Sequence, residues 1–508
     1  MTARSATFAL IAFAAAWVAV ALLTYRGYGL TWDEEHQLLV AREAHRYYAS
    51  FGRDTAIFDN FYGSPDIKTR GVLYVGALYG LVSLTTPPWW DLLHLLNGLF
   101  ALLGPLLVWG LVTELTRNRA AGLAAALLLA FYPPYYGHAF NNTKDIPAAV
   151  FVAATLLFGA RLLNATRERA LDAFAFALAL ALAVGQRMPL AYLPALWLPC
   201  YVWKRRTRRA QRLSLAVLAA AALAGLTLLH LSQPYLASRP LVGLVDMART
   251  ALGFPWKDRV LFEGRDVWSW ELRWYYLPKW IAITTPVLSL AFFALGNFAV
   301  ARKLVHRNEG DAEQRPALLY VLGGFWAPLA LVLLTRPVLY DAWRQFLFLA
   351  PALVVIAALG LQQLFAAARA WRVAAWTLLS LNLAVTGIAL VRLHPYEYVY
   401  FNRLVGGLAG AYQRYETDYW GASYREALDW VRAHKDAYRD SDGKVYLDTC
   451  LPDTSVQFLD EDMCLDRDRA RLYVCSTRWH LEERRPGPIV HVVEREGVPL
   501  NLVKEVEP

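Results

Sequence analysis

About eleven apolar stretches divide this chain of 508 residues, and each has close to the length that crosses a lipid bilayer. A transmembrane helix needs roughly 20 apolar residues, with a range of about 17 to 25. Hydrophobic residues make up 57% of the sequence, more than one soluble core can bury. We therefore predict a polytopic all-α membrane protein with about 11 transmembrane helices, near residues 7–25, 91–114, 119–136, 146–163, 170–185, 189–203, 212–231, 279–301, 317–335, 343–363 and 371–391.

The charged loops between these stretches indicate which way the chain faces. Basic residues gather at 204–212 and 302–307, and such loops usually stay on the cytoplasmic side. Counting spans back from them places the loop 26–90 outside, provided that residues 71–84 do not cross. That stretch, of about 14 residues, is short for a span and suits an interfacial helix, as does the region 32–48. Because inner loops explain the net charge of +9, we expect no nucleic-acid partner.

The composition changes after residue 391, where charged residues become frequent. Residues 423–433 have helical spacing, with Tyr424, Ala427, Leu428 and Val431 toward one side. Short strand-like runs follow at 444–447, 471–475, 489–493 and 500–503. We therefore predict two domains, a transmembrane domain over 1–391 and a small C-terminal α/β domain over 392–508, outside the membrane.

Three of the four cysteines lie in this C-terminal part, and the fourth, Cys200, lies within an apolar stretch. An oxidising compartment allows a disulfide between Cys450 and Cys464, with Cys464–Cys475 as the competing pairing. The cysteines have no CxxC or Cys/His spacing of a zinc site, and no second cluster of hard ligands is evident. We therefore expect neither a metal nor another cofactor.

The first candidate site follows the first apolar stretch, in Gly29-Leu30-Thr31-Trp32-Asp33-Glu34-Glu35-His36. Three consecutive acids stand where a membrane helix should reach the surface, and charges so near the hydrocarbon are costly, which makes them functional candidates. The alternative is a solvated helix start, with Thr31 as N-cap and the acids favoured by the helix dipole. We select Asp33 and Glu34 as candidate catalytic residues.

A second motif, residues 135–147, separates the third and fourth apolar stretches. Asp145 stands directly before an apolar run and Pro147 follows, a pattern typical of an N-cap aspartate and an N1-type proline. The same carboxylate would lie at the membrane depth of Asp33, and Lys144 beside it favours its charged form. We select Asp145 as a further candidate catalytic residue, and His138, Asn142 and Lys144 as candidate substrate-binding residues.

A third motif, residues 335–344, carries basic side chains at the outer end of the ninth stretch, against the usual charge bias. Pairing with Asp341, or snorkelling toward headgroups, would explain Arg336 and Arg344. The alternative is that a planar guanidinium binds a phosphate through two parallel hydrogen bonds. The candidate substrate-binding residues on this outer face are Lys68, Arg70, Arg187, Arg336, Tyr340, Asp341 and Arg344.

An aromatic run, residues 394–402, leaves the last apolar stretch and is followed by the mixed segment 416–426. Aromatic residues of this kind are enriched where a membrane meets water. Interleaved with Asn402, Glu416 and Asp418, the rings also resemble surfaces on which sugars stack. The run fits an acceptor site or a contact between domains.

Together, the acidic pair in a long first outer loop, the two interfacial helices, the number of spans and the outer C-terminal domain resemble the GT-C superfamily. Within it, the chain is most similar to the family of protein O-mannosyltransferases and the lipid A aminoarabinose transferase. Thr-Trp-Asp-Glu at 31–34 resembles the first-loop Asp-Glu motif, and Lys-Asp-Ile-Pro at 144–147 resembles an Asp-Pro element. The segments 339–344 and 416–421 resemble a bacterial branch of the family. Glu35, a third acid, departs from its pattern.

The resemblance implies a GT-C fold and an inverting glycosyltransferase, hexosyl or pentosyl, that uses a polyprenyl-phosphate sugar at the periplasmic face of a bacterial inner membrane. Inversion requires a base for the acceptor and stabilisation of the departing phosphate. Asp33 is our candidate base, aided by Glu34, with a raised pKa expected from partial burial and like charges. Asp145 would orient the acceptor or hold a cationic partner. The phosphate would be bound by Arg344, Arg336, Arg70 and Lys68.

Two other functions fit a polytopic protein with scattered charges. A transporter or flippase of a lipid-linked sugar would place its ionisable groups near the bilayer midplane and often shows inverted repeats. A membrane scaffold would leave Asp33, Asp145 and Arg344 without a shared purpose. Because the charges collect at one face, we expect the enzyme, with membrane lipids around it and a lipid, a glycan or a protein as acceptor.

Overall fold

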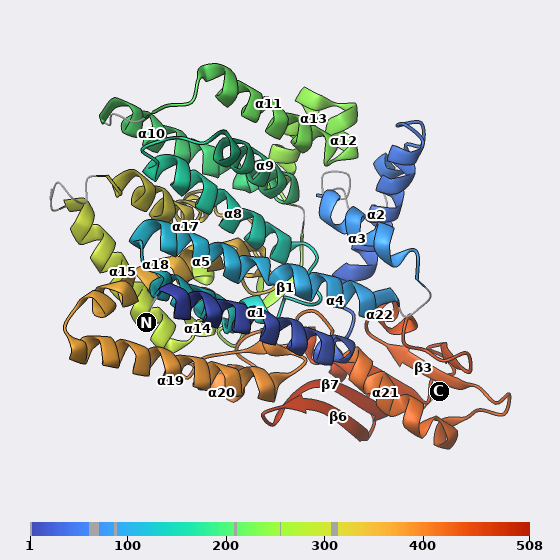
Figure 1. Ribbon diagram of the computed structural model, residues 1–508. Coiled ribbons are helices and arrows are strands. Elements are labelled where there is room, and N and C mark those ends of the chain that lie inside the picture. The colour runs from blue at the N-terminus through green and yellow to red at the C-terminus, as the bar shows by residue number, and fades with distance from the viewer. Residues whose placement is uncertain are drawn as a thin grey trace.

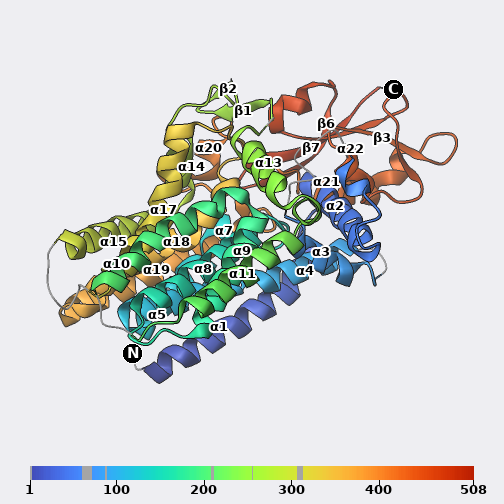
Figure 2. The ribbon, with the colours of Figure 1, turned by 90° about the horizontal axis from the view of Figure 1, so that it is seen from above.

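The computed structural model describes residues 3–59, 71–85, 89–207, 211–254, 256–305 and 313–507. Long helices run roughly parallel and form a bundle (Figures 1 and 2). The helices of this bundle are α1 (Ala3–Thr24), α4 (Trp89–Ala101), α5 (Leu103–Thr116), α6 (Arg119–Ala130), α8 (Asp145–Asn164), α9 (Ala170–Gln186), α10 (Tyr192–Thr207), α11 (Leu215–Leu231), α15 (Val287–Val305), α17 (Arg315–Thr335), α18 (Ala350–Ala366) and α19 (Arg369–Leu393).

Shorter elements gather with the C-terminal domain at one end of the bundle, whereas the N-terminus lies at the other (Figure 2). Helices form within both stretches that the sequence predicts to be helical in the loop 26–90, at 32–49 and 73–82. The short elements at this end are α2 (Trp32–Ala49), α3 (Leu73–Val82), α7 (Pro133–Tyr136), α12 (Pro234–Ser238), α13 (Pro240–Leu252), α14 (Tyr276–Thr284), α20 (Gly407–Ala411), and a hairpin of β1 (Arg259–Phe262) and β2 (Arg265–Trp268).

All of the predicted spans are helical, and the all-α membrane fold is confirmed. In the described residues, seven helices are long and apolar enough to cross a membrane, and the chain is a multi-pass membrane protein. The remaining predicted spans fall on shorter helices, α6, α9, α10 and α11, of 12, 17, 16 and 17 residues. A helix of 17 residues is about 25 Å long, slightly under the hydrocarbon thickness.

Small residues let the central helices approach closely. Gly296 of α15 faces the backbone of α18, where a Cβ would lie only 1.8 Å from the carbonyl oxygen of Ile356. Gly360 of α18 faces Gly296 in turn. In a membrane, where lipid tails are as apolar as leucine, such contacts hold helices together by packing. The helices α8 and α18 are the most deeply buried of the membrane-length helices.

The loops predicted to lie inside meet at one end of the bundle. Asn164 Nδ2 donates to Glu114 Oε1 at 3.3 Å, and Lys204 Nζ donates to Glu168 Oε1 at 2.9 Å. Asn118 Nδ2 donates to the side chain of Gln362 at 2.8 Å. These contacts join the ends of α5, α8, α10 and α18, which are far apart in the sequence, so the loops at these ends share one face of the bundle.

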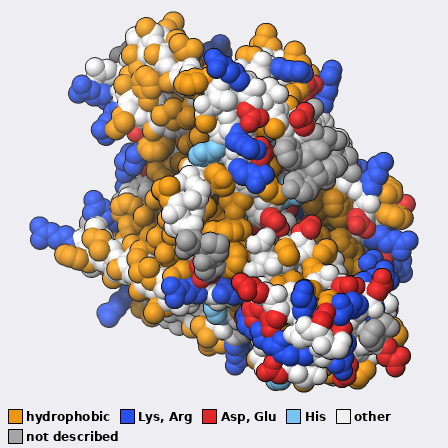
Figure 3. Space-filling model, turned by 90° about the vertical axis from the view of Figure 1, so that its right-hand side faces the viewer, with side chains coloured by type: hydrophobic (Ala, Val, Ile, Leu, Met, Phe, Trp, Pro, Cys, Tyr) orange, Lys and Arg blue, Asp and Glu red, His pale blue; other side chains and the backbone are white. Residues whose placement is uncertain are grey.

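The C-terminal part contains the predicted strand-bearing domain, with charged side chains of both signs on its surface (Figure 3). Its five-stranded sheet has the order β4-β3-β5-β7-β6, in which β3 is parallel to both neighbours and β7 is antiparallel to both of its own. Tyr424, Ala427, Leu428 and Val431 are buried, as the helical spacing predicts. Its elements are α21 (Tyr424–His434), β3 (Val445–Thr449), α22 (Pro452–Val456), β4 (Met463–Leu465), β5 (Leu472–Ser476), β6 (Ile489–Arg495) and β7 (Val498–Glu505).

The disulfide joins Cys450 to Cys475, so both predicted pairings are wrong. Strand register explains the correction, because Leu447 of β3 lies opposite Leu472 of the parallel strand β5. Three residues further along both strands, the two cysteines lie side by side with their Cα atoms 5.3 Å apart. Cys464 is on β4, on the other side of β3, and is free.

Candidate active site

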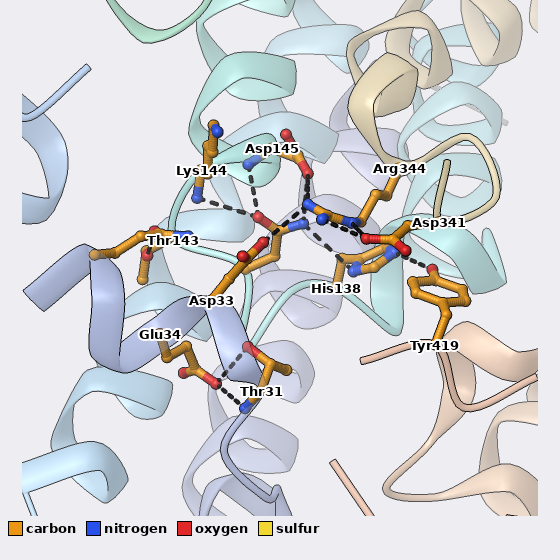
Figure 4. Close-up of polar contacts among 12 residues, drawn as sticks. Thr31, Asp33, Glu34, His138, Thr143, Lys144, Asp145, Asp341, Arg344 and Tyr419 are labelled. Atoms are coloured by element: carbon orange, nitrogen blue, oxygen red, sulfur yellow. Dashed lines mark hydrogen bonds and ion pairs between the residues drawn. The ribbon is translucent and has the colours of Figure 1, made fainter. Parts of the chain in front are cut away.

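The three acids of the first motif begin helix α2 and point in three directions. Thr31 and Glu34 form a capping box, in which Glu34 Oε2 accepts the Thr31 N–H at 2.7 Å. Glu34 is fully buried and its Oε1 lies 2.8 Å from His94 Nε2 on α4. Glu35 accepts a hydrogen bond from Gln457 of the C-terminal domain at 3.3 Å, and burial raises its pKa. Successive helical residues are about 100° apart, so Asp33 alone of the three points to the charged cluster (Figure 4).

The second motif presents Asp145 from the start of helix α8. Asn142 Oδ1 accepts the backbone N–H of Asp145 at 2.7 Å and that of Lys144 at 3.1 Å, so Asn142 provides the cap. The expectation of an N-cap aspartate at Asp145 is therefore wrong. Because its carboxylate is not used by the backbone, it is available to side chains. Arg187 Nε donates to Asp145 Oδ1 at 2.8 Å, and Asn142 Nδ2 donates to Oδ2 at 3.0 Å.

The third motif turns through a loop whose backbone is unusual at two adjacent positions. Asp341 and Ala342 have φ of 52° and 57°, in the left-handed region that residues other than glycine rarely adopt. Such strain persists only where surrounding contacts hold it, and it is common at functional sites. The loop delivers Arg344 at the start of the 3-10 helix η6 (Arg344–Leu349).

These elements bring three carboxylates around one guanidinium (Figure 4). Arg344 Nη2 and Nε donate to Asp341 Oδ2 at 2.6 and 3.0 Å. Its Nη1 lies 3.1 Å from Asp33 Oδ2 and 3.6 Å from Asp145 Oδ2. The Asp33 side chain is 24% exposed, compared with 1% for Asp145 and 0% for Asp341. Asp33 is thus the most accessible carboxylate of the three.

A cavity of about 390 Å³ opens beside this cluster. Asp33, Lys144, Arg187 and Arg344 line its charged part. Tyr340 stacks on Trp256 with ring centres 4.2 Å apart and helps to form an aromatic wall. The remaining lining is mostly apolar and includes Met247, Ala251, Phe254, Leu331, Val332, Pro337, Val338, Phe346 and Phe348.

Other predicted site residues lie outside this cavity lining. His138 is buried behind it, with Nε2 3.0 Å from the Tyr419 hydroxyl, and burial together with the charge of Arg344 lowers its pKa to about 3. Arg336 is exposed and ends helix α17 in a left-handed conformation. Lys68 and Arg70 lie outside the described residues.

The C-terminal domain adds an arginine that the sequence analysis missed. Arg478 Nη2 lies 2.5 Å from Asp341 Oδ1 and 3.6 Å from Glu416 Oε1. Burial raises the pKa of Glu416 to about 8, against the opposing attraction of Arg478. The signal in the sequence was the run Arg478-Trp479-His480, which places charged and aromatic side chains directly after an apolar strand.

One group of residues in the described part of the chain has the side chains and spacing to hold a metal ion. Potential ligand atoms of His480, Glu482 and Glu483 lie within 4.8 Å of one another. These residues lie in η9 (Arg478–Glu483), and none of them lines the cavity that contains Asp33.

Comparison with family models supports the resemblance indicated by the motifs. Residues 92–231 match the family described as dolichyl-phosphate-mannose-protein mannosyltransferase. The chain resembles the protein O-mannosyltransferases over this stretch. The matched segment runs from α4 through α11 and includes the second motif with Asp145 and Arg187. No curated protein matches the chain.

Among solved structures, similar chains include ArnT from Cupriavidus metallidurans bound to undecaprenyl phosphate, with 15% identity, a TM-score of 0.49, and coverage of 99% of this chain and 98% of that chain. The apo state of the same ArnT has 15% identity and a TM-score of 0.49, with coverage of 97% and 98%. Arabinofuranosyltransferase AftD from Mycobacteria has 13% identity and a TM-score of 0.44, with coverage of 98% of this chain and 41% of that chain.

Proposed function

We propose that this protein is an inverting membrane glycosyltransferase that moves a sugar from a polyprenyl-phosphate donor to an acceptor. One observation carries the proposal. An accessible carboxylate, Asp33, lies beside the basic side chains of Lys144, Arg187 and Arg344 at the charged part of a cavity whose other walls are mostly apolar. The family match over residues 92–231 supports the same class of reaction, since its description names a lipid-phosphate sugar.

The cavity suits the two chemically different parts of such a donor. A phosphate is best bound by planar guanidinium groups and by an ammonium, which Arg187, Arg344 and Lys144 supply. A polyprenyl chain is apolar and would lie along the apolar walls, where its burial is favourable. Asp145 holds Arg187 through one carboxylate oxygen and faces Arg344 with the other. Its role in this proposal is to hold the two cationic partners in place.

The chemistry requires a proton acceptor and a stabilised leaving group. In the proposed step, the acceptor hydroxyl gives its proton to Asp33, and its oxygen bonds to the anomeric carbon. The bond from that carbon to the phosphate oxygen breaks, and the phosphate leaves with the electron pair. Preorganised cations at the departing oxygen stabilise the charge that develops there. Attack from the face opposite the phosphate inverts the anomeric carbon.

The orientation of the charged loops favours a site on the periplasmic face of a bacterial inner membrane. The loops that follow α5, α8 and α10 lie at the end of the bundle away from helix α2 (Figure 2). Positive charge is usually retained in the cytoplasm. The same argument favours a C-terminal domain outside the cytoplasm, and a disulfide such as Cys450–Cys475 is stable in that compartment.

The experiment that tests the reaction class uses the purified protein in proteoliposomes with radiolabelled polyprenyl-phosphate sugars. The proposal predicts that donor is consumed and that label leaves the lipid when membrane extract supplies acceptors. A flippase of a lipid-linked sugar would instead move label between leaflets while the sugar stays on its lipid. Label that crosses the bilayer without being released from the donor would contradict the proposal.

A further inference from the structure

Arg478 belongs to the C-terminal domain but is buried against the membrane domain. It opens η9, directly after strand β5 and its short turn, and its side chain is only 3% exposed. Its Nη1 donates to the backbone carbonyl of Tyr419. The guanidinium carbon lies 4.3 Å from the ring centre of Trp32 and 4.0 Å from that of Trp479. A single side chain thus contacts the segment that precedes the C-terminal sheet and the first turn of α2.

Asp341 connects this arginine to the candidate active site. Its Oδ1 lies 2.5 Å from Arg478 Nη2, while its Oδ2 accepts from Arg344 at 2.6 Å. The other end of the Arg344 guanidinium lies 3.1 Å from Asp33. The ion pairs therefore run without interruption from Arg478 through Asp341 and Arg344 to Asp33.

The two contacts of Arg478 act on both partners of the Asp33–Arg344 pair. By covering the Trp32 ring, Arg478 contacts the residue next to Asp33. By occupying one oxygen of Asp341, it leaves only the other for Arg344. Loss of Arg478 would leave Asp341 Oδ1 without its cation, and Arg344 would become the only cation that the Asp341 carboxylate contacts among these residues. Without Arg478, Arg344 would shift toward Asp341 and away from Asp33.

The C-terminal domain is also attached at places that do not involve this chain of charges. Arg425 Nη1 donates to the carbonyl of Tyr28 at 2.8 Å and lies 3.4 Å from Asp91. Gln457 Nε2 donates to Glu35 Oε1 of α2 at 3.3 Å. The C-terminal domain is therefore held against the membrane domain without Arg478 as well. The contact between Arg478 and Asp341 needs another explanation.

We propose that Arg478 is a positioning residue through which the C-terminal domain holds Asp341, and through it Arg344, in place beside Asp33. The inference rests on the proposed glycosyltransferase function and adds a role for the C-terminal domain in it. Arg478 would not touch the reacting atoms. It would set the distance between the base and the cation that faces it.

The test compares Arg478→Lys and Arg478→Ala with Arg425→Lys and Arg425→Ala, which alter a docking arginine of the same domain. We expect kcat to fall about 10- to 100-fold in Arg478→Ala, with partial recovery in Arg478→Lys. The acidic limb of the pH profile of kcat/KM should move upward by about one pH unit, because an opposite charge near a carboxylate lowers its pKa and that charge would now be more distant. The Arg425 variants should keep the wild-type pH limb.

An unchanged pH profile, with activity lost only in proportion to folded protein, would overturn the proposal. A readout without activity separates it from the proposed function. Melting temperatures of Arg478→Lys, Asp341→Asn and the double variant should be non-additive, because the two side chains form one contact. Wild-type protein that transfers no sugar would refute the proposed function, whereas additive melting shifts would overturn the role of Arg478.

Discussion

Replacement of Arg344 by lysine separates its charge from its shape. An ammonium keeps the positive charge but cannot hold Asp341 through Nε and Nη2 while a third nitrogen faces Asp33. A hydrogen bond to a charged group contributes about 1.5–3 kcal/mol. If one such contact is lost from the transition state, kcat/KM should fall about 10- to 150-fold, since about 1.4 kcal/mol corresponds to a factor of ten.

The assay measures kcat/KM for transfer from a polyprenyl-phosphate sugar, together with the melting temperature of each variant. Arg403→Lys is the matched control, because Arg403 is exposed and belongs to the segment that follows the last bundle helix. Arg344→Ala should in addition lose about 3–5 kcal/mol of stability, because it removes one partner of the buried Arg344–Asp341 ion pair. Wild-type kcat/KM in Arg344→Lys would show that the fork geometry of the Arg344 guanidinium does not contribute to transfer.

Three further predictions concern stability and can be measured by thermal unfolding in detergent. Glu34→Gln should destabilise the protein by roughly 1–3 kcal/mol, because the buried Glu34 side chain accepts the backbone N–H of Thr31 and contacts His94. An unchanged melting temperature would show that these contacts do not stabilise the start of α2. Burial raises the pKa of Glu416 in the folded protein to about 8, above its ordinary value of 4.5, so the free energy of unfolding should fall as pH rises between these two values. Glu416→Gln should remove this fall. An equal fall in the variant would exclude Glu416 as its source. Reduction of Cys450–Cys475, which closes a loop of 25 residues, should cost about 3.5 kcal/mol by loop entropy, whereas Cys464→Ser should change stability little.

The membrane helices could be predicted from the sequence because apolar length alone determines them. The break between α14 and α15 was not predicted, although Pro286 marks it. Thr285, the residue before this proline, is extended, with φ of −88° and ψ of 132°, as expected before proline. The hairpin β1–β2 was also missed, since its strands have only four residues each and lie within a long loop.

Within the candidate site, Asp33, Asp145 and Arg344 can be selected from the sequence because each is a charge at the end of an apolar stretch. Their mutual distances depend on packing among helices that the sequence does not order in space. The same limit explains the wrong disulfide, which required the order of strands in the sheet. Arg478 was missed because its partner Asp341 is 137 residues away in the chain.

The separation of roles among three consecutive acids also depends on the structure. The sequence does not distinguish the roles of Asp33, Glu34 and Glu35. In the helix, Asp33 lines the cavity, Glu34 belongs to the capping box, and Glu35 contacts the C-terminal domain. The sequence alone therefore predicts that Glu34 assists Asp33 in catalysis. The geometry instead supports Glu34 as the residue that holds the start of α2, and hence Asp33, in place.

In the proposed reaction, Asp33 is the base that deprotonates the acceptor. The most direct test measures transfer from radiolabelled polyprenyl-phosphate sugars by wild type, Asp33→Asn and the neighbouring control Glu35→Gln in the same membranes. We predict that Asp33→Asn loses about 100- to 10,000-fold in rate, the usual contribution of general-base catalysis, while Glu35→Gln stays near wild type and all three proteins remain folded. Full transfer by Asp33→Asn would contradict the account.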